Sequence, residues 1–226
     1  MKFFILTYYF FRSLFLRGPF RHFQLLLGEV YFERKYGIRT TGFKTSQSDQ
    51  HHHYQAAAYS VLNRVFSGIK PLTEGYAFYD IGCGKGRVLF MAAKTGYKKL
   101  YGIELDAVLL EEAKQNFKSQ RIKEMVSEIH FVQKNVLEYT FENQPSIYFL
   151  FNPFNAEVMK GFIDSALSSN KQECYIVYMN PLFSKVFKNK GIQVQKIIRS
   201  FLYTEAIIYR VPKRLDSPDG VLEDQI

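Results

Sequence analysis

A glycine-rich loop between a predicted strand and a predicted helix constrains the fold of this chain more than any other feature. Residues 80–86 read Asp-Ile-Gly-Cys-Gly-Lys-Gly, at the end of the apolar run 77–81 and at the start of a helix expected over 85–95. Gly82 and Gly84 allow the backbone to turn tightly and to approach a ligand. The free N–H groups at the start of the helix would face that ligand. The segment therefore predicts a ligand-binding loop.

The spacing of the loop narrows the kind of ligand. Gly86 allows close packing of strand and helix, but Arg87 stands where a dinucleotide fingerprint needs glycine, and a Walker phosphate loop is also absent. Glu104 follows the next predicted strand, 24 residues after Asp80. At that position a carboxylate can accept hydrogen bonds from both hydroxyls of a ribose. The pattern favours a nucleoside ligand without a pyrophosphate.

Strands and helices alternate after residue 76. Apolar runs predict strands, and segments with helical spacing lie between them, which is typical of right-handed βαβ units in a mostly parallel sheet. The last two strands are separated by only a few residues, so they should form an antiparallel hairpin. Strands are expected over 77–81, 99–103, 129–133, 146–151, 174–178, 192–198 and 202–210, and helices over 85–95, 107–119 and 156–167.

The chain divides into three parts by pattern. Residues 1–75 are expected to form an N-terminal helical extension and lid, residues 76–212 the α/β core, and residues 213–226 a disordered acidic tail. Within the extension, residues 1–37 have helical character that Gly18-Pro19 interrupts, 38–53 read as a loop, 54–66 as a helix and 68–75 as a connector.

The net charge and the N-terminal residues indicate which kinds of molecule this protein could bind. The 226 residues carry a net charge of +9 and a pI near 9.4, which favours nucleic acid, ribosomes or anionic lipid without choosing among them. Residues 1–16 are mostly aromatic and apolar, but Arg12 interrupts them and Arg17 ends them. No small-residue cleavage site follows, so neither a spanning helix nor a signal peptide is expected. Residues 1–17 could contact a membrane surface or pack on the core or on a second subunit.

Two cysteines indicate a reducing compartment, and a cytoplasmic location is expected.

The segment 77–211 resembles the class I SAM-dependent methyltransferases, where SAM is S-adenosylmethionine. The D-x-G-x-G-x-G loop, the acid after the second strand and the antiparallel final hairpin carry this resemblance. It implies SAM as cofactor and a seven-stranded, mostly parallel sheet of order 3-2-1-4-5-7-6, with an antiparallel last strand and helices on both faces. The chain is similar to small bacterial methyltransferases of unassigned substrate. It is more distantly similar to non-SET lysine methyltransferases, which share an Arg or Gln at the position of Arg87.

The resemblance also implies roles for individual residues. Asp80 and the loop glycines would hold the methionine part of SAM, Glu104 would bind its ribose, and Leu105 would pack on its adenine. Asn135 stands where the family usually has Asp, and its carbonyl can accept from the adenine amine. The complete predicted cofactor set is Tyr54, Gln55, Asp80, Gly82, Cys83, Gly84, Gly86, Glu104, Leu105, Asn135, Val136 and Asn152.

Asn152-Pro153-Phe154, after the fourth strand, are the predicted catalytic residues. They resemble the (D/N/S)-P-P-(Y/F) motif of amino-group methyltransferases, with one proline missing. There the polar side chain and a backbone carbonyl accept the amine hydrogens, and the ring packs on the substrate. We therefore expect N-methylation of a lysine-like amine on a protein. The alternatives are a nucleic-acid amino group, a small molecule, a SAM-binding scaffold without turnover, or a turn that contacts no substrate.

Three adjacent histidines, His51, His52 and His53, precede the segment expected to cover the cofactor. They cannot all reach one metal from regular structure, and no Cys or acid completes a zinc pattern, so no metal is expected. We interpret the stretch as part of a lid in which Tyr54 and Gln55 contact the methionine end of SAM. A role for His53 as the base that keeps the amine neutral stays open.

Overall fold

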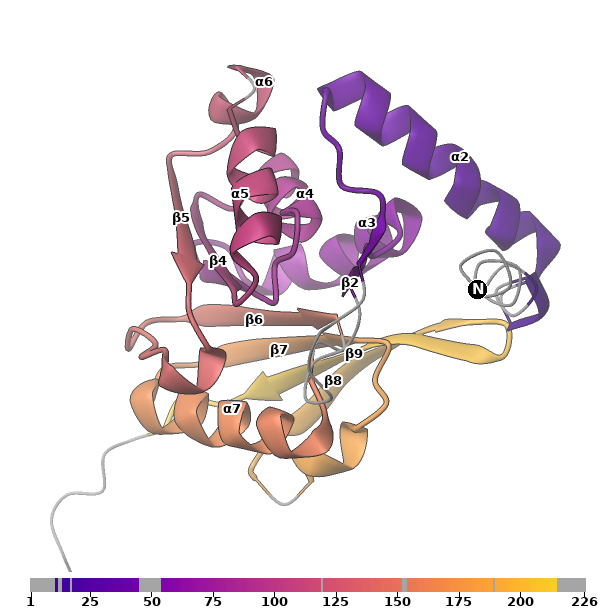
Figure 1. Ribbon diagram of the computed structural model, residues 1–226. Helices are drawn as coiled ribbons and strands as arrows, with labels where there is room; N and C mark the ends of the chain where they lie inside the picture. The colour runs from indigo at the N-terminus through magenta and orange to yellow at the C-terminus, as the bar shows by residue number, and fades with distance from the viewer. Residues whose placement is uncertain are drawn as a thin grey trace, which may run out of the picture.

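The predicted strands assemble into one seven-stranded sheet, shown in Figure 1. This computed structural model describes residues 11, 14–16, 18–44, 54–118, 120–151, 154–188 and 190–214. The strands of the sheet are β3 (Ala77–Ile81), β4 (Lys99–Glu104), β5 (Glu128–Gln133), β6 (Ser146–Phe151), β7 (Cys174–Met179), β8 (Gln193–Ser200) and β9 (Tyr203–Val211). The helices are α2 (Pro19–Tyr36), α3 (Tyr59–Ile69), α4 (Arg87–Thr95), α5 (Ala107–Asn116), α6 (Gln120–Lys123) and α7 (Ala156–Ser169). Short 3-10 turns are η1 (Lys70–Leu72), η2 (Val136–Glu138) and η3 (Ser184–Phe187), and β1 (Phe43–Lys44) pairs with β2 (Tyr54–Gln55).

The strand order across the sheet is β5-β4-β3-β6-β7-β9-β8. Neighbours are parallel from β5 to β7, whereas β9 pairs antiparallel with β7, and β8 antiparallel with β9. Counted along the chain this is 3-2-1-4-5-7-6 with an antiparallel last strand, so the predicted fold is confirmed. Because parallel strands end at one edge of a sheet, the segments that follow β3, β4 and β6 meet there.

Two layers of helices bury the two faces of the sheet. In Figure 1, α3, α4 and α5 lie on one face and α7 lies on the other. On the first face the ring of Phe66 in α3 stacks on Phe149 of β6 at 6.2 Å between centroids. On the second face Tyr148 of β6 meets Phe162 of α7 edge to face at 5.9 Å. These are fully buried side chains, as expected for strands covered on both faces.

Several helix boundaries differ from the predicted ones. The helix predicted over 54–66 begins five residues later, at Tyr59, because Tyr54 and Gln55 form β2 and pair with β1, which the sequence did not predict. The helix predicted from residue 85 begins at Arg87, because Gly86 has a φ of 81°, outside the helical range. The helix predicted over 107–119 ends at Asn116. Sequence spacing identified the elements, while pairing and glycine conformation set their ends.

The N-terminal extension packs on the core through α2. Gly18 has a φ of 81° and Pro19 opens the helix, so the predicted interruption at Gly18-Pro19 is confirmed. Phe32 of α2 stacks on Tyr59 of α3 with ring centroids 4.7 Å apart, and Tyr36 lies 4.7 Å from the ring of Phe90. Among the residues described, no helix combines the length and apolarity needed to cross a membrane. The predicted limits of the extension and the acidic tail stay predictions.

Candidate cofactor site

The glycine loop is fixed to the end of the neighbouring strand. The backbone N–H groups of Gly82 and Cys83 both donate to the carbonyl of Ile103 in β4, at 2.8 and 3.1 Å. Gly82 and Gly84 have φ angles of 75° and 52°, which residues with a Cβ rarely adopt. The two glycines are therefore required by the turn itself. The loop lies at the carboxyl edge of the sheet, where ligands bind in open α/β folds.

Glu104 joins the end of β4 to this loop. Its Oε2 accepts from the N–H of Gly84 at 2.9 Å, and its Oε1 accepts from the N–H groups of Leu105 and Asp106 at 2.8 and 2.9 Å. Burial raises the pKa of Glu104, and these backbone hydrogen bonds oppose that rise. The carboxylate lies where the sequence predicted it, beside the glycine loop. An ionised carboxylate offers about four lone-pair sites, so one remains for a ribose hydroxyl.

Asp80 contributes a second, more deeply buried carboxyl group. Asp80 is 3% exposed and lies in β3, opposite Gly102 of β4. Its buried Oδ2 accepts no hydrogen bond from any residue that the structure describes. Burial raises the pKa of Asp80 well above its ordinary value, and the negative charge of Glu104 raises it further. Since buried polar atoms almost always have a partner, this oxygen suggests a donor that a ligand supplies.

The other described members of the predicted cofactor set follow the strands β3, β4 and β5. Cys83 is buried, and burial raises the pKa of its thiol well above the ordinary value, so it acts as a small side chain beneath the loop. Leu105 is 47% exposed, which leaves its side chain accessible to a flat apolar group. Asn135 accepts from the N–H of Leu137 at 3.1 Å and begins η2, where Val136 is buried. Their contacts with adenine stay predictions.

Gly86 is required for packing as well as for its backbone angle. A Cβ built on it would lie 3.2 Å from Cβ of Ala113 and 3.3 Å from Cε2 of Phe117. Both neighbours belong to the region of α5. The glycine therefore allows α5 to approach the loop, whereas the sequence suggested contact between strand and helix.

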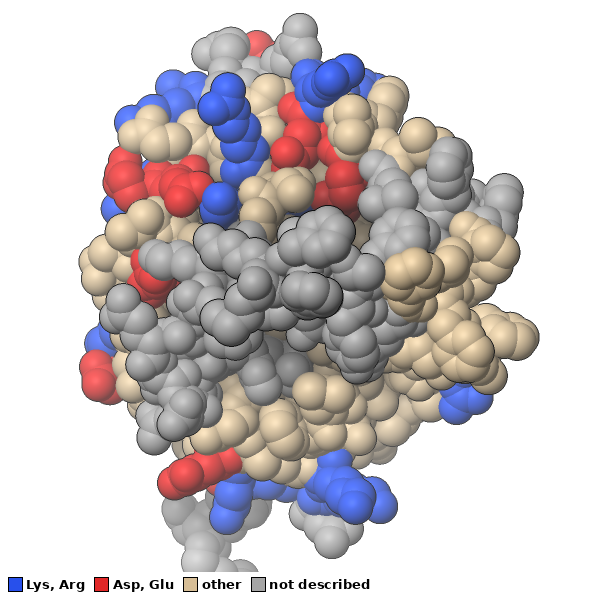
Figure 2. All heavy atoms as spheres, turned by 45° about the vertical axis from the view of Figure 1, so that its right-hand side comes forward, with Lys and Arg blue, Asp and Glu red and all other residues tan. Residues whose placement is uncertain are grey.

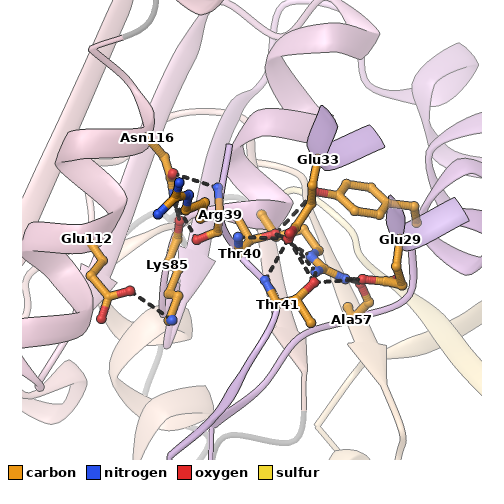
Figure 3. Close-up of polar contacts among 11 residues, drawn as sticks. Glu29, Glu33, Arg39, Thr40, Thr41, Ala57, Lys85, Glu112 and Asn116 are labelled. Carbon is orange, nitrogen blue, oxygen red and sulfur yellow. Dashed lines mark hydrogen bonds and ion pairs between the residues drawn. The ribbon is translucent and has the colours of Figure 1, made fainter. Parts of the chain in front are cut away.

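Arg87, directly after the loop, is the centre of a buried polar network that joins the N-terminal extension to the core. Figure 3 labels its partners Glu29, Glu33, Thr40, Thr41 and Ala57. Arg87 is 3% exposed. Its guanidinium forms ion pairs with Glu29 and Glu33 of α2, at 2.6 and 3.2 Å. It also donates to the hydroxyls of Thr40 and Thr41, at 2.7 and 2.9 Å. One side chain therefore holds both α2 and the segment that leads from α2 to β1.

The same guanidinium holds the far end of the extension. Its Nη1 donates to the carbonyl of Ala57 at 2.9 Å, and its carbon lies 4.3 Å from the ring centroid of Tyr59. Arg87 thus binds residues on both sides of the β1–β2 ribbon. Because it begins α4 immediately after Gly86, the ribbon and the glycine loop share one anchor.

Glu33 is the main acceptor in this network. Its Oε1 accepts from the N–H and hydroxyl groups of Thr40 and Thr41, at distances from 2.6 to 2.9 Å. Burial acts to raise the pKa of Glu33, but the hydrogen bonds from both threonines and the charge of Arg87 outweigh it, so the pKa is lowered. Glu33 is therefore ionised at neutral pH and pairs with Arg87 as a charge.

A third connection reaches the loop from α5. Asn116 accepts from the N–H of Arg39 at 2.9 Å and donates to the carbonyls of Arg39 and Lys85, at 3.2 and 3.0 Å. Lys85 forms an ion pair with Glu112 at 2.8 Å. Asn116 therefore bridges the extension to the glycine loop itself, as Figure 3 shows.

Sequence reasoning noted Arg87 but did not predict its partners. A detectable feature was present, since Arg87 opens the otherwise apolar run Val88–Ala93 of a helix expected to be buried. A buried Arg needs carboxylate partners. Glu29 and Glu33, four residues apart on one helix face, could supply them.

The predicted transfer site is described only in part. Asn152, Pro153, His51, His52 and His53 lie outside the described residues. The backbone of Tyr54 and Gln55 forms β2, and their side chains also lie outside what is described. Phe154 is 5% exposed and belongs to the core layer beneath α7. Its contact with a substrate stays a prediction.

Among the described residues, no group of three or more His, Cys, Asp or Glu side chains is placed to hold a metal ion. The three adjacent histidines are not among these residues.

Comparison with known proteins shows what the central part of the chain is similar to. Residues 78–171 match the family described as methyltransferase domain. A ribosomal protein L11 methyltransferase of Oceanobacillus iheyensis is 31% identical over 109 residues, which are 48% of this chain and 32% of that protein. A second one, of Anoxybacillus flavithermus, is 29% identical over 97 residues, 43% of this chain and 29% of that protein. The chain spans about a third of the length of these curated relatives.

Solved structures agree in fold. Magnesium protoporphyrin IX methyltransferase from Synechocystis PCC 6803, with bound SAM, superposes with a TM-score of 0.52 at 16% identity, covering 68% of this chain and 78% of that one. A ribosomal protein L11 methylase from Lactobacillus delbrueckii superposes with a TM-score of 0.51 at 14% identity, covering 69% and 79%. The family match, the strand order and the loop geometry agree. Residues 78–171, which hold the glycine loop, are thus similar to methyltransferase domains, and the sheet has the fold of the class I SAM-dependent methyltransferases.

Proposed function

We propose that this protein binds SAM at residues 80–86 and transfers its methyl group to an amino group on a protein side chain. The observation that carries the first half is the buried Oδ2 of Asp80, which has no donor among the described residues. It lies in the strand that leads into a loop of three glycines with positive φ. An ammonium group is a donor that a carboxylate binds strongly in a buried site.

The residues present fit SAM in charge and in the groups that they offer to it. SAM, when bound, supplies a methyl group on a positively charged sulfonium, together with an ammonium, a ribose and an adenine. Asp80 and Glu104 place two carboxyl groups beside the loop, and the cost of burying both is reduced by a cation. Leu105, at 47% exposure, offers an apolar surface beyond Glu104 for the adenine.

The transfer step is an in-line displacement. The lone pair of a neutral amine forms the N–CH₃ bond, the C–S bond breaks, and its electron pair stays on sulfur, which leaves S-adenosylhomocysteine. The methylated nitrogen then releases one proton to solvent. Asn152 and the adjacent backbone carbonyl would accept the two amine hydrogens and so orient the lone pair. This role rests on the resemblance of residues 152–154 to amino-group methyltransferases.

A protein acceptor is favoured over the alternatives by the curated relatives. Two proteins that match about half of this chain are named ribosomal protein L11 methyltransferase. A nucleic-acid amino group is the second candidate, because the net charge of +9 favours a polyanion. Both candidates use the same orientation of an amine by Asn152, so they differ in the acceptor and not in the chemistry.

Calorimetric titration with SAM tests the cofactor site. Gly84→Val should abolish binding, because a side chain at a φ of 52° distorts the loop, and Glu104→Ala should abolish it by removing the acceptor that the loop surrounds. Gly75→Ala is the matched control for a glycine with positive φ, since a Cβ there meets nothing within 4 Å. Unchanged affinity in Gly84→Val and Glu104→Ala would refute the assignment of the site.

Labelled SAM tests the acceptor. With cell extract and tritiated methyl, we expect label that protease releases and nuclease does not. Release by nuclease alone would replace the protein acceptor with nucleic acid. Asn152→Ala should keep its affinity for SAM and lose transfer, and transfer at the normal rate would refute the orienting role.

A further inference from the structure

The N-terminal helix turns its acidic side chains inward. Residues 1–36 contain six Lys or Arg and two acids, Glu29 and Glu33. Both acids form ion pairs with Arg87, and their side chains are only 24% and 21% exposed. A surface helix ordinarily buries its apolar stripe and exposes its charges. In α2 the carboxylates face the core instead.

The outward side of α2 is consequently apolar and basic. Leu27, Val30 and Tyr31 are 59%, 53% and 55% exposed, and their spacing of three and four residues places them on one face. Arg34 and Lys35 are exposed in the last turn. This face of α2 therefore exposes three large apolar side chains to solvent, followed by two positively charged ones.

The turn between β8 and β9 carries a second pair of exposed apolar side chains. Phe201 and Leu202 form the turn and are 77% and 57% exposed. The N–H of Leu202 donates to the carbonyl of Leu16 at 3.0 Å, which fixes the turn against the residues that precede α2. Among those residues Phe11 and Phe15 are 61% and 72% exposed. Figure 1 shows the turn projecting past the sheet next to the beginning of α2.

The charged residues near the turn between β8 and β9 are basic, like those in the last turn of α2. Residues 191–204 contain Lys196 and Arg199 and no acid. Figure 2 brings this side of the molecule forward and shows tan residues along its right-hand edge with Lys and Arg beneath them. Single exposed apolar residues are common, but a group of them beside basic residues marks a binding surface.

We propose that this surface, which we call the N-terminal face, docks on an anionic lipid membrane. Its apolar members are Phe11, Phe15, Leu27, Tyr31, Phe201 and Leu202. Aromatic side chains insert at the level of the lipid headgroups, and Lys and Arg are attracted to anionic lipids within a Debye length. The pairing of Glu29 and Glu33 with Arg87 neutralises the two acids of α2, which matches that chemistry. The inference is independent of the proposed acceptor, because it uses none of the site residues.

Vesicle co-sedimentation of the full chain tests the proposal. We expect binding to phosphatidylcholine vesicles that contain 30% phosphatidylglycerol, at least tenfold weaker binding to pure phosphatidylcholine, and loss of affinity at high salt. The double variant Phe201→Ser/Leu202→Ser keeps every charge and should bind anionic vesicles at least tenfold more weakly. The double variant Leu72→Ser/Leu182→Ser removes two leucines that are also exposed, 41% and 59%, and should bind like the parent.

Each contrary outcome overturns the proposal. Equal binding of the parent and Phe201→Ser/Leu202→Ser would mean that charge alone acts. Absence of vesicle binding would refute docking on lipid directly. If sedimentation velocity then shows a dimer that Phe201→Ser/Leu202→Ser dissociates, the N-terminal face belongs to a second copy of the chain. Thermal melting of both variants should match the parent, because the substituted side chains are exposed.

Discussion

Replacing Asp80 with Asn should stabilise the protein without ligand and weaken its affinity for SAM. Asp80 is 3% exposed, and its Oδ2 has no hydrogen-bond partner among the described residues. Leaving such a group buried costs about 1–3 kcal/mol. Asn has the same shape without a charge, so Asp80→Asn should raise the free energy of unfolding by about 1–2 kcal/mol at neutral pH. For a chain of this length that raises Tm by roughly 2–8 °C.

The gain in stability should depend on pH in a defined direction. Burial, together with the charge of Glu104, raises the pKa of Asp80 in the folded protein. The folded state then binds this proton more tightly than the unfolded state, so protonation of Asp80 contributes stability that is complete below the ordinary value of about 4. That contribution is lost as pH rises through the raised pKa. The difference in Tm between Asp80→Asn and the parent should be small near pH 4 and should widen toward neutral pH.

Asp80→Asn should weaken the affinity for SAM, although it raises the stability of the protein. A hydrogen bond to a charged group contributes about 1.5–3 kcal/mol, so its loss should weaken SAM roughly 10- to 150-fold in calorimetric titration. Stability and affinity would thus move in opposite directions in one variant. This pattern is characteristic of a residue kept for binding and not for folding.

Asp106→Asn is the matched control. Asp106 lies two residues after Glu104 and accepts from the N–H groups of Val108 and Leu109 at the start of α5. Asn caps helices as well as Asp does, so this variant removes the same charge without losing the cap. It should change Tm and SAM affinity little. If Asp80→Asn instead destabilises the protein at every pH, Oδ2 has a structural partner. If its SAM affinity is unchanged, Asp80 does not contact the cofactor.

Two further predictions concern the surroundings of the loop. Arg87→Met should lower the free energy of unfolding by about 3 kcal/mol in urea titrations, because it leaves Glu29 and Glu33 without their cation. Adding Glu29→Gln and Glu33→Gln should recover part of this loss. If the loss does not change, the ion pairs are not its cause. Gly86→Ala should lower the free energy of unfolding by about 1–2 kcal/mol because its φ is 81°, and by a further amount because the new Cβ would contact Ala113. Its Tm should therefore fall further than that of Gly75→Ala, where φ is 79° and the new Cβ would meet no atom within 4 Å. Equal losses in the two variants would mean that packing against α5 is unimportant.

The sequence predicted the sheet well because its determinants are local. Residues 146–151 are an apolar run as long as β6 itself, and the buried strand has the predicted bounds. Glycines 82, 84 and 86 all have the positive φ that a tight ligand loop requires. The carboxylate of Glu104 lies beside that loop, as its place after the second strand indicated.

The N-terminal region was predicted less well because its determinants are distant in sequence. Val61, Leu62 and Val65 do line a helix, but the helix begins at Tyr59 because residues 54–55 pair with 43–44. Periodicity within a window cannot detect that pairing. The partners of Arg87 lie 30 to 58 residues away, so only the isolated charge in an apolar helix pointed to them.

Arg87 connects the two unusual features of this molecule. It occupies the position at which a dinucleotide-binding loop would need glycine, and that substitution allows a long side chain to leave the start of α4 toward α2. By pairing with Glu29 and Glu33, it neutralises both carboxylates of the N-terminal helix and holds them toward the core. The same pairs therefore fix the extension beside the glycine loop and leave the N-terminal face apolar and basic. A variant that cannot form them should lose the position of the extension and gain acidic groups on that face, so Arg87→Met should weaken both SAM affinity and adsorption to anionic vesicles.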